Sequence, residues 1–168
     1  IGSSDFTKVN ALANTASYAG GFTGGIVATI SGNASDLSGA NLNQLAAATD
    51  NITFTVADNP TVAQLKTISD RTSAANITVS GSITDDLYNF IDSGDNSSNT
   101  TNFAAALSHT TNEPIVLNAY TVTSNNNITA INALLAAAEA GVTGTITDNN
   151  GSEVLNTAVD LTTTSDDT

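Results

Sequence analysis

The stretch from Asp50 to Asp58 restricts what this chain can fold into more than any other. Ile52, Phe54 and Val56 stand at every second position, and the residues between them are polar or small. A period of two places these three side chains on one face of an extended segment. We therefore predict a strand over residues 50–58, with its apolar face buried.

A helix is predicted directly after this strand. Pro60 stops the extended pattern, and Val62, Leu65 and Ile68 then recur at helical spacing. The helix is expected to run from about Pro60 to Arg71. Proline would stand at the first helical position, where its missing N–H leaves no hydrogen bond unmade.

The same strand–helix unit recurs along the chain in weaker forms. Apolar alternation followed by helical spacing predicts it on both sides of residues 50–71. The N-cap of the helix predicted at residues 85–92 is expected to be Thr84. The predicted strands are residues 25–32, 50–58, 76–83, 114–122 and 142–148, and the predicted helices are residues 40–48, 60–71, 85–92, 127–140 and a final one that contains Val154 and Leu155.

Recurrence at this spacing indicates an array in which each unit buries its apolar face against the next. The strand centres are about 25 to 37 residues apart, which is typical of repeat proteins. Because a helix separates successive strands, the strands are expected to be parallel. We predict an α/β fold, a solenoid-like stack of about five strand–helix repeats with a parallel sheet. The alternative is a single α/β domain with a parallel or mixed sheet, which has the same pattern of elements.

The repeat domain is predicted to span residues 25–161. Residues 1–24 are interpreted as an N-terminal cap or connector, and residues 93–113 as a turn-rich insertion. Residues 162–168 are predicted to be a polar tail or linker. The chain begins with Ile1 and not with Met, as expected for a processed mature chain or a segment of a longer one.

The scarcity of basic residues limits the partners of this chain. Its formal net charge is −13, from 16 acidic and 3 basic residues. So few cations cannot neutralise a run of phosphates, and an anionic bilayer would repel the chain. No apolar run approaches the roughly 20 residues that span a bilayer. We therefore expect neither nucleic-acid binding nor membrane insertion, and the absence of Cys excludes disulfides and thiolate metal sites within the chain.

A resemblance to known repeats adds to this interpretation. Segments 51–68, 76–91 and 142–159 share the pattern Asn-Ile-Thr or a variant of it, a strand ending near Asp, and Leu and Ile at helical spacing. They resemble the Thr/Asn/Ala-rich strand–helix repeats of large surface proteins of marine bacteria, especially cyanobacteria, and of appendage proteins of cyanophages. The resemblance implies a structural or adhesive role in a cell-surface layer, fibre or virion appendage, and it implies no catalytic residues.

Few residues are candidates for chemistry. His109 is the single histidine and its neighbours in sequence are hydroxyl residues, so no catalytic and no cofactor-binding residue is predicted. Carboxylate and amide oxygens are ligands that Ca²⁺ prefers, and the sequence suggests no cofactor other than Ca²⁺. The alternative is that these residues cap helices and form turns. The Ca²⁺ candidates are Asp85, Asp86, Asp92, Asp95, Asp148 and Asn150.

These observations favour a structural protein over an enzyme. We expect an extracellular module of a surface layer, fibre or phage appendage, at the surface of a cell or virion, that acts through contacts with neighbouring copies or modules. The alternative is an adhesin-type binding module that recognises a glycan or host surface through residues 93–113. A polysaccharide lyase or hydrolase is least favoured, because clustered bases and tryptophans are absent.

Overall fold

The computed structural model describes residues 1–14, 25–73, 77–90, 114–122, 130–132, 134–135 and 142–148. These residues form a mixed α/β structure with two parallel sheets of three strands each. The elements in chain order are η1 (Ser3–Asp5), α1 (Phe6–Ala13), β1 (Val27–Gly32), α2 (Ala34–Leu37), η3 (Ala40–Leu42), β2 (Asn51–Val56), α3 (Val62–Ser69), β3 (Ile77–Val79), β4 (Ile83–Asp85), α4 (Leu87–Phe90), β5 (Ile115–Val122) and β6 (Val142–Asp148).

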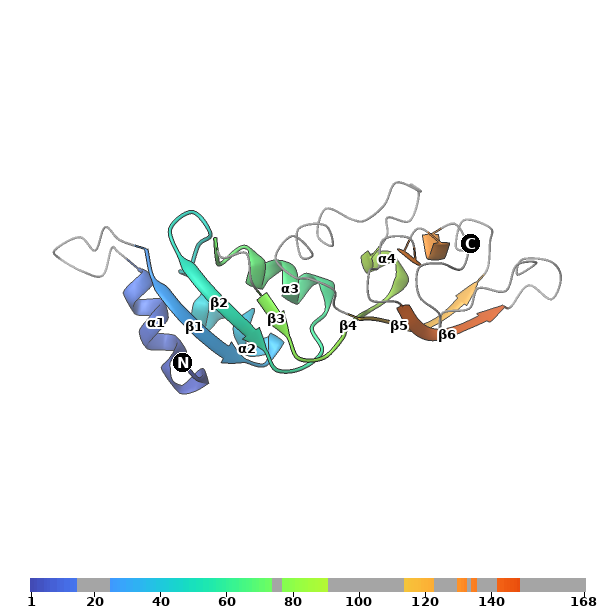
Figure 1. The fold of residues 1–168 in the computed structure, drawn as a ribbon, viewed down its shortest axis with the longest axis horizontal. Helices are drawn as coiled ribbons and strands as arrows, with labels where there is room; N and C mark the ends of the chain where they lie inside the picture. Colours follow the sequence, from blue (N-terminus) through green and yellow to red (C-terminus); the bar gives the residue numbers. More distant parts are fainter. Residues whose placement is uncertain are drawn as a thin grey trace.

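Strands that are neighbours in a sheet are also successive in the chain. One sheet has the order β1-β2-β3 and the other β4-β5-β6, and every pairing is parallel. Figure 1 shows the strands following one another along the long axis, from β1 near the N-terminus to β6. The predicted α/β class and parallel pairing are confirmed. The alternative of a single α/β domain also fits this arrangement.

The two sheets meet between β3 and β4, where the chain bends at Ser80 and Gly81. At the start of the bend, the Ser80 N–H donates a hydrogen bond to the Val56 carbonyl oxygen at 2.8 Å. After the bend, the Thr84 N–H donates to the Pro60 carbonyl oxygen at 3.0 Å. Backbone pairing to the preceding part of the chain therefore continues from one sheet into the other.

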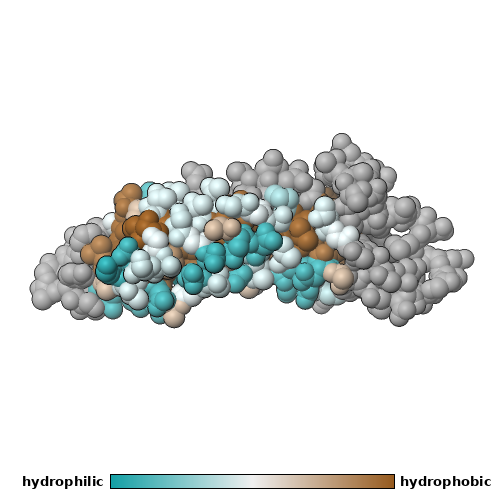
Figure 2. Space-filling view, turned by 90° about the horizontal axis from the view of Figure 1, so that it is seen from below, coloured by the Kyte–Doolittle hydropathy of each residue, from teal (hydrophilic) through white to brown (hydrophobic). Residues whose placement is uncertain are grey.

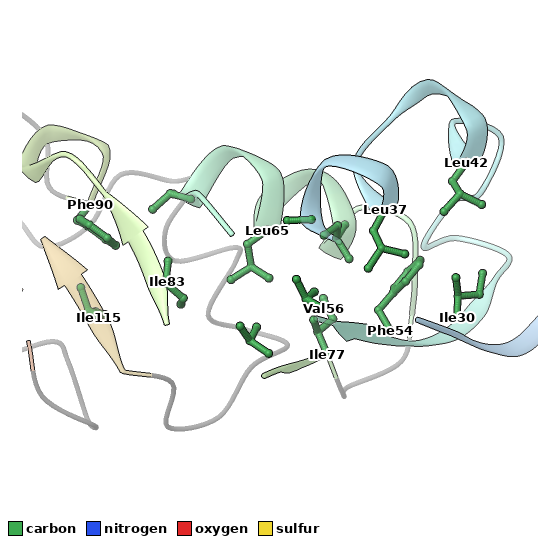
Figure 3. Packing of buried hydrophobic residues seen from close by; sticks show 14 of the residues in the cluster. Ile30, Leu37, Leu42, Phe54, Val56, Leu65, Ile77, Ile83, Phe90 and Ile115 are labelled. Atoms are coloured by element: carbon green, nitrogen blue, oxygen red, sulfur yellow. The ribbon is translucent and has the colours of Figure 1, made fainter. Parts of the chain in front are cut away.

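One apolar core lies between the strands and the helices. In the first sheet, Ile30, Phe54 and Ile77 are in register, and none is more than 3% exposed. Leu37 from α2 and Leu65 from α3 cover this row from the helical side (Figure 3). The corresponding row in the second sheet consists of Ile83, Ile115 and Val142.

Helix α1 covers one end of this core. Its apolar residues Phe6 and Val9 are buried in the same cluster as the sheet residues. The Asn10 side-chain oxygen accepts a hydrogen bond from the Gln44 N–H at 2.8 Å, and α1 also contacts η3. The predicted boundary at residue 24 stays a prediction, because residues 15–24 lie outside the described residues.

Few large hydrophobic side chains are exposed among the described residues. The face shown in Figure 2 is largely white and teal, with smaller brown, hydrophobic areas. Among the described residues, the exposed large hydrophobic side chains are Ile1, at 49% exposure, and Val27, at 81%. In the same part of the chain, no helix is long and apolar enough to cross a membrane.

Most predicted strands are found as single strands, including β2 within residues 50–58. The prediction of one strand over residues 76–83 is wrong, because β3 and β4 are separated at Gly81. A Cβ at Gly81 would lie 2.0 Å from the side-chain oxygen of Asn59, which accepts a hydrogen bond from the Ser82 N–H at 3.0 Å. Gly81 therefore leaves room for the side chain of Asn59, which stabilises the bend between β3 and β4.

The helix predicted at Pro60 begins later. Helix α3 starts at Val62, and its N-cap is Thr61. The Thr61 hydroxyl accepts from the Gln64 N–H at 3.2 Å, and the Gln64 side chain accepts from the Thr61 N–H at 3.0 Å. This reciprocal capping box fixes the start of the helix, so proline lies before it and not at its first position.

Two other predicted helices are corrected. Residues 40–48 form a short 3-10 helix, η3, and turns in place of the predicted α-helix, and a short helix that the sequence pattern does not predict, α2, lies before them. Thr84 does not cap a helix at residues 85–92, because Thr84 and Asp85 belong to β4 and α4 starts at Leu87. Of the helix predicted at residues 127–140, residues 130–132 and 134–135 are described, and they are helical. Residues 93–113, the final predicted helix and the tail at 162–168 lie outside the described residues.

Replacing Gly25 by alanine is expected to destabilise the fold by about 2 kcal/mol. A Cβ at this position would lie 1.5 Å from the Thr49 carbonyl oxygen, so one of two backbone segments must move. Urea unfolding of Gly25→Ala measures the loss. Gly2→Ala is the matched control, since a Cβ at Gly2 meets nothing within 4 Å. Equal unfolding midpoints for the two variants would contradict this close approach.

Candidate functional site: charged side chains between successive units

A unit is defined here as a strand segment with the helix that follows it: β1 with α2, β2 with α3, and β3–β4 with α4. Three carboxylates lie between successive units, and each accepts a backbone N–H of the preceding unit or of the residue that leads into it. Donor and acceptor residues are 24, 24 and 23 positions apart. The pairs are Asp50 with Ile26 at 2.8 Å, Asp58 with Ala34 at 2.7 Å, and Asp85 with Val62 at 2.9 Å.

The strand register explains this recurring spacing. β1 pairs with β2 at an offset of 24 residues (Val27 with Asn51), and β2 pairs with β3 at an offset of 23 (Phe54 with Ile77). A carboxylate one unit later therefore stands directly beside the N–H that it accepts. The offset of 23 to 24 residues therefore places the buried apolar side chains in rows and also brings each carboxylate next to its N–H donor.

Helix α2 is stabilised at both ends by the next unit. It has four residues, which is too short for a helix to persist alone. Asp58 accepts the N–H of Ala34, the first helical residue, and Arg71 donates to the carbonyl oxygens at the other end. An acid at the N-terminus and a base at the C-terminus also complement the helix dipole.

Arg71 is 7% exposed, and its guanidinium contacts three carbonyl oxygens. It donates to Leu37, to Ser38 at 2.9 Å and to Gly39 at 3.0 Å. Burial lowers the pKa of Arg71 below its usual value. Its hydrogen-bond donors satisfy the carbonyls that the end of a helix leaves without intrahelical partners. The arrangement positions the backbone at the end of α2.

Arg71→Met is expected to lower the free energy of unfolding by about 2 kcal/mol, because buried carbonyls at the end of α2 lose a charged donor. Lys66→Met is the matched control: its ion pair with Asp70 involves an exposed carboxylate, and exposed pairs contribute about 0–1 kcal/mol. Urea unfolding followed by circular dichroism measures both. A loss for Arg71→Met no larger than that for Lys66→Met would contradict the proposed role of the arginine.

The calcium candidate Asp85 is occupied by hydrogen-bond donors. It is 7% exposed, and besides Val62 its carboxylate accepts from the Asp86 N–H at 2.9 Å and the Asn89 side chain at 2.6 Å. Asp86 is exposed and accepts from the side chain of Asn118 at 2.8 Å. Both acids of this pair therefore bind protein N–H groups, and Asp85 supplies the N–H of Val62 with an acceptor.

The side chains of the other predicted site residues are outside the described part of the chain. Asp148 is the last residue of β6, and its side chain is not described. Asp92, Asp95, His109 and Asn150 lie outside the described residues. Within the part of the chain that is described, no group of three or more His, Cys, Asp or Glu side chains could hold a metal ion. The calcium assignment stays a prediction.

Asp50 and Thr72 make further buried polar contacts near the start of β2. Asp50, 3% exposed, accepts the N–H groups of Ile26 and Ala46, both at 2.8 Å. Thr72 is fully buried, and its hydroxyl accepts from the Ile52 N–H at 2.8 Å and donates to the Ile52 carbonyl at 2.7 Å. These side chains replace backbone pairing at the start of β2, where the strand register begins.

Comparisons with known proteins returned no match: no family model, no curated protein and no solved structure is similar to this chain.

Proposed function

We propose that this chain is a structural module of an extracellular surface layer, fibre or phage appendage, and that it acts through contacts with neighbouring modules. The proposal rests on the partners of the buried polar side chains, which are backbone groups in or beside neighbouring units. Asp50, Asp85 and Arg71 all bind backbone groups that belong to another unit or border it. Their contribution is to hold one unit on the next, as a structural array requires.

A solenoid-like stack is the finer form of this proposal. Strands in chain order, parallel pairing and a near-constant register of 24 and then 23 residues support it. The later pairings are longer, at 32 residues between Ile83 and Ile115 and 27 between Ile115 and Val142. Additional residues between successive strands would account for these longer units, because the strand rows themselves stay in register.

The surface supports placement outside a cell. Thr, Ser and Asn are abundant in the chain and charged residues make up only 11% of it, so we expect the hydration of its surface to depend little on salt. A module of this kind needs no catalytic group. The adhesin-type alternative depends on residues 93–113, which lie outside the described residues.

Two copies of the chain joined head to tail test this proposal. If the copies stack, the tandem protein melts at a higher temperature than one copy, because terminal interfaces become internal. X-ray scattering should show one particle of unchanged cross-section and greater length. A matched tandem in which the second copy carries Phe54→Asp should lose the gain. Independent particles that melt at the single-copy temperature would refute the proposal.

A further inference from the structure

The first residue of the chain already pairs with the outer edge of the first sheet. The Ile1 nitrogen donates to the Thr29 carbonyl oxygen at 3.1 Å, and the Ser31 N–H donates to the Ile1 carbonyl oxygen at 3.1 Å. These two bonds flank Ile30 and form the pattern of a parallel bridge. Ile1 therefore occupies the position that Phe54 occupies on the other edge of β1.

The backbone groups of β1 alternate between its two edges. Ile26 and Gly32 direct their carbonyl oxygens to β2, where the N–H groups of Asn51 and Ala57 donate to them. The residues in between, Thr29 among them, direct their groups to the outer edge. In a chain extended before Ile1, the carbonyl two positions upstream would meet the N–H of Thr29.

The helix after Ile1 also has the place of a unit's helix. α1 begins five residues after Ile1, and α2 begins four residues after Ile30, its bridge partner. The ring of Phe6 reaches β1, since a Cβ at Gly32 would lie 3.1 Å from it. Residues 1–13 thus contain the end of a strand and the helix that follows it. The exposed large hydrophobic residues of the described chain are Ile1, which pairs with β1, and Val27, which belongs to β1.

We propose that the outer edge of β1 is a strand-binding site, and that its occupant is an extended segment of the same repeat type that leads into Ile1. The segment would run parallel to β1, with an apolar side chain two positions before Ile1. That side chain would stand beside Ala28, as Ile52 does on the other edge. The inference rests on the proposed function, since it names the contact that joins this module to a preceding one.

The full chain with Asn-Ile-Thr added before Ile1 tests this site. The added residues copy Asn51–Thr53, so the added isoleucine would point into the core. The control extension, Ile-Asn-Thr, has the same composition but turns its isoleucine outward. The measurement is amide hydrogen exchange of Thr29 by NMR in both extended proteins and in the original chain.

The in-register extension is expected to slow exchange of the Thr29 amide at least about tenfold, because that N–H gains a hydrogen bond. The control should give little protection, and protection should not depend on protein concentration. Equal exchange in all three proteins would refute the site, and equal protection by both extensions would refute its register. Protection that grows with concentration would assign the edge to a second copy. A tandem protein that fails to stack while Thr29 is protected would refute the proposed function alone.

Discussion

Phe54→Asp is expected to abolish cooperative folding of this chain. Phe54 is fully buried and stands in register between Ile30 and Ile77, in the row that joins three strands. Truncating a buried phenylalanine costs about 3–5 kcal/mol. An unpaired carboxylate in the core adds a large desolvation cost. The sum reaches the total stability of an ordinary domain, about 5–15 kcal/mol.

Urea unfolding and limited proteolysis measure this effect. We expect the variant to lack a sigmoidal transition and to be cleaved under conditions in which the original chain is intact. Val27→Asp is the matched control, because it places the same carboxylate on the same sheet at a side chain that is 81% exposed. Its expected change is within about 0.5 kcal/mol. A sigmoidal transition of Phe54→Asp at the original midpoint would contradict the shared core.

The sequence was most informative where local pattern and burial agree. β2 alternates Ile52, Phe54 and Val56 with polar residues, and the structure buries these three side chains completely. A strand with one buried face needs this period whatever its neighbours are. The predicted class and the parallel pairing follow from the same pattern, since a helix between strands brings the next strand back in the same direction.

The boundaries were less well predicted because side chains decide them. The apolar spacing and Pro60 predict a start of α3 near residue 60, whereas Thr61 and Gln64 have the spacing of a capping box that starts the helix at Val62. That signal was present in the sequence. Helix α2 offered no such signal, since four residues show no periodicity and their stability comes from Asp58 and Arg71 in the next unit.

The contacts between units could be recognised only once the register was known. The acidic sequence around Asp85 predicts a calcium ligand, whereas the backbone N–H that Asp85 accepts belongs to Val62, 23 residues earlier. Local sequence does not distinguish a carboxylate that binds a cation from one that accepts N–H groups of another unit. Aligning the chain at an offset of 23 to 24 residues would have paired Asp58 with Ala34 and Asp85 with Val62.

Asp50→Ala is expected to lower the free energy of unfolding by about 3–5 kcal/mol. The carboxylate of Asp50 accepts the N–H groups of Ile26 and Ala46 and the hydroxyl of Thr49 at 3.2 Å. Alanine removes the acceptor of the two N–H groups at a residue that is 3% exposed. Each buried backbone group that loses its partner costs about 1–3 kcal/mol.

Asp58→Ala provides the comparison that tests this explanation. Asp58 makes the same kind of contact between units, but it is exposed and accepts one N–H, that of Ala34. Water can replace an acceptor there, so we expect a loss of about 1 kcal/mol, as for an ordinary helix cap. Urea unfolding of the two variants separates burial from position in the repeat. Equal losses of unfolding free energy would contradict this explanation, because burial would then have no effect on the strength of these contacts. A larger loss for Asp50→Ala is expected because water is excluded around Asp50 and cannot replace its carboxylate.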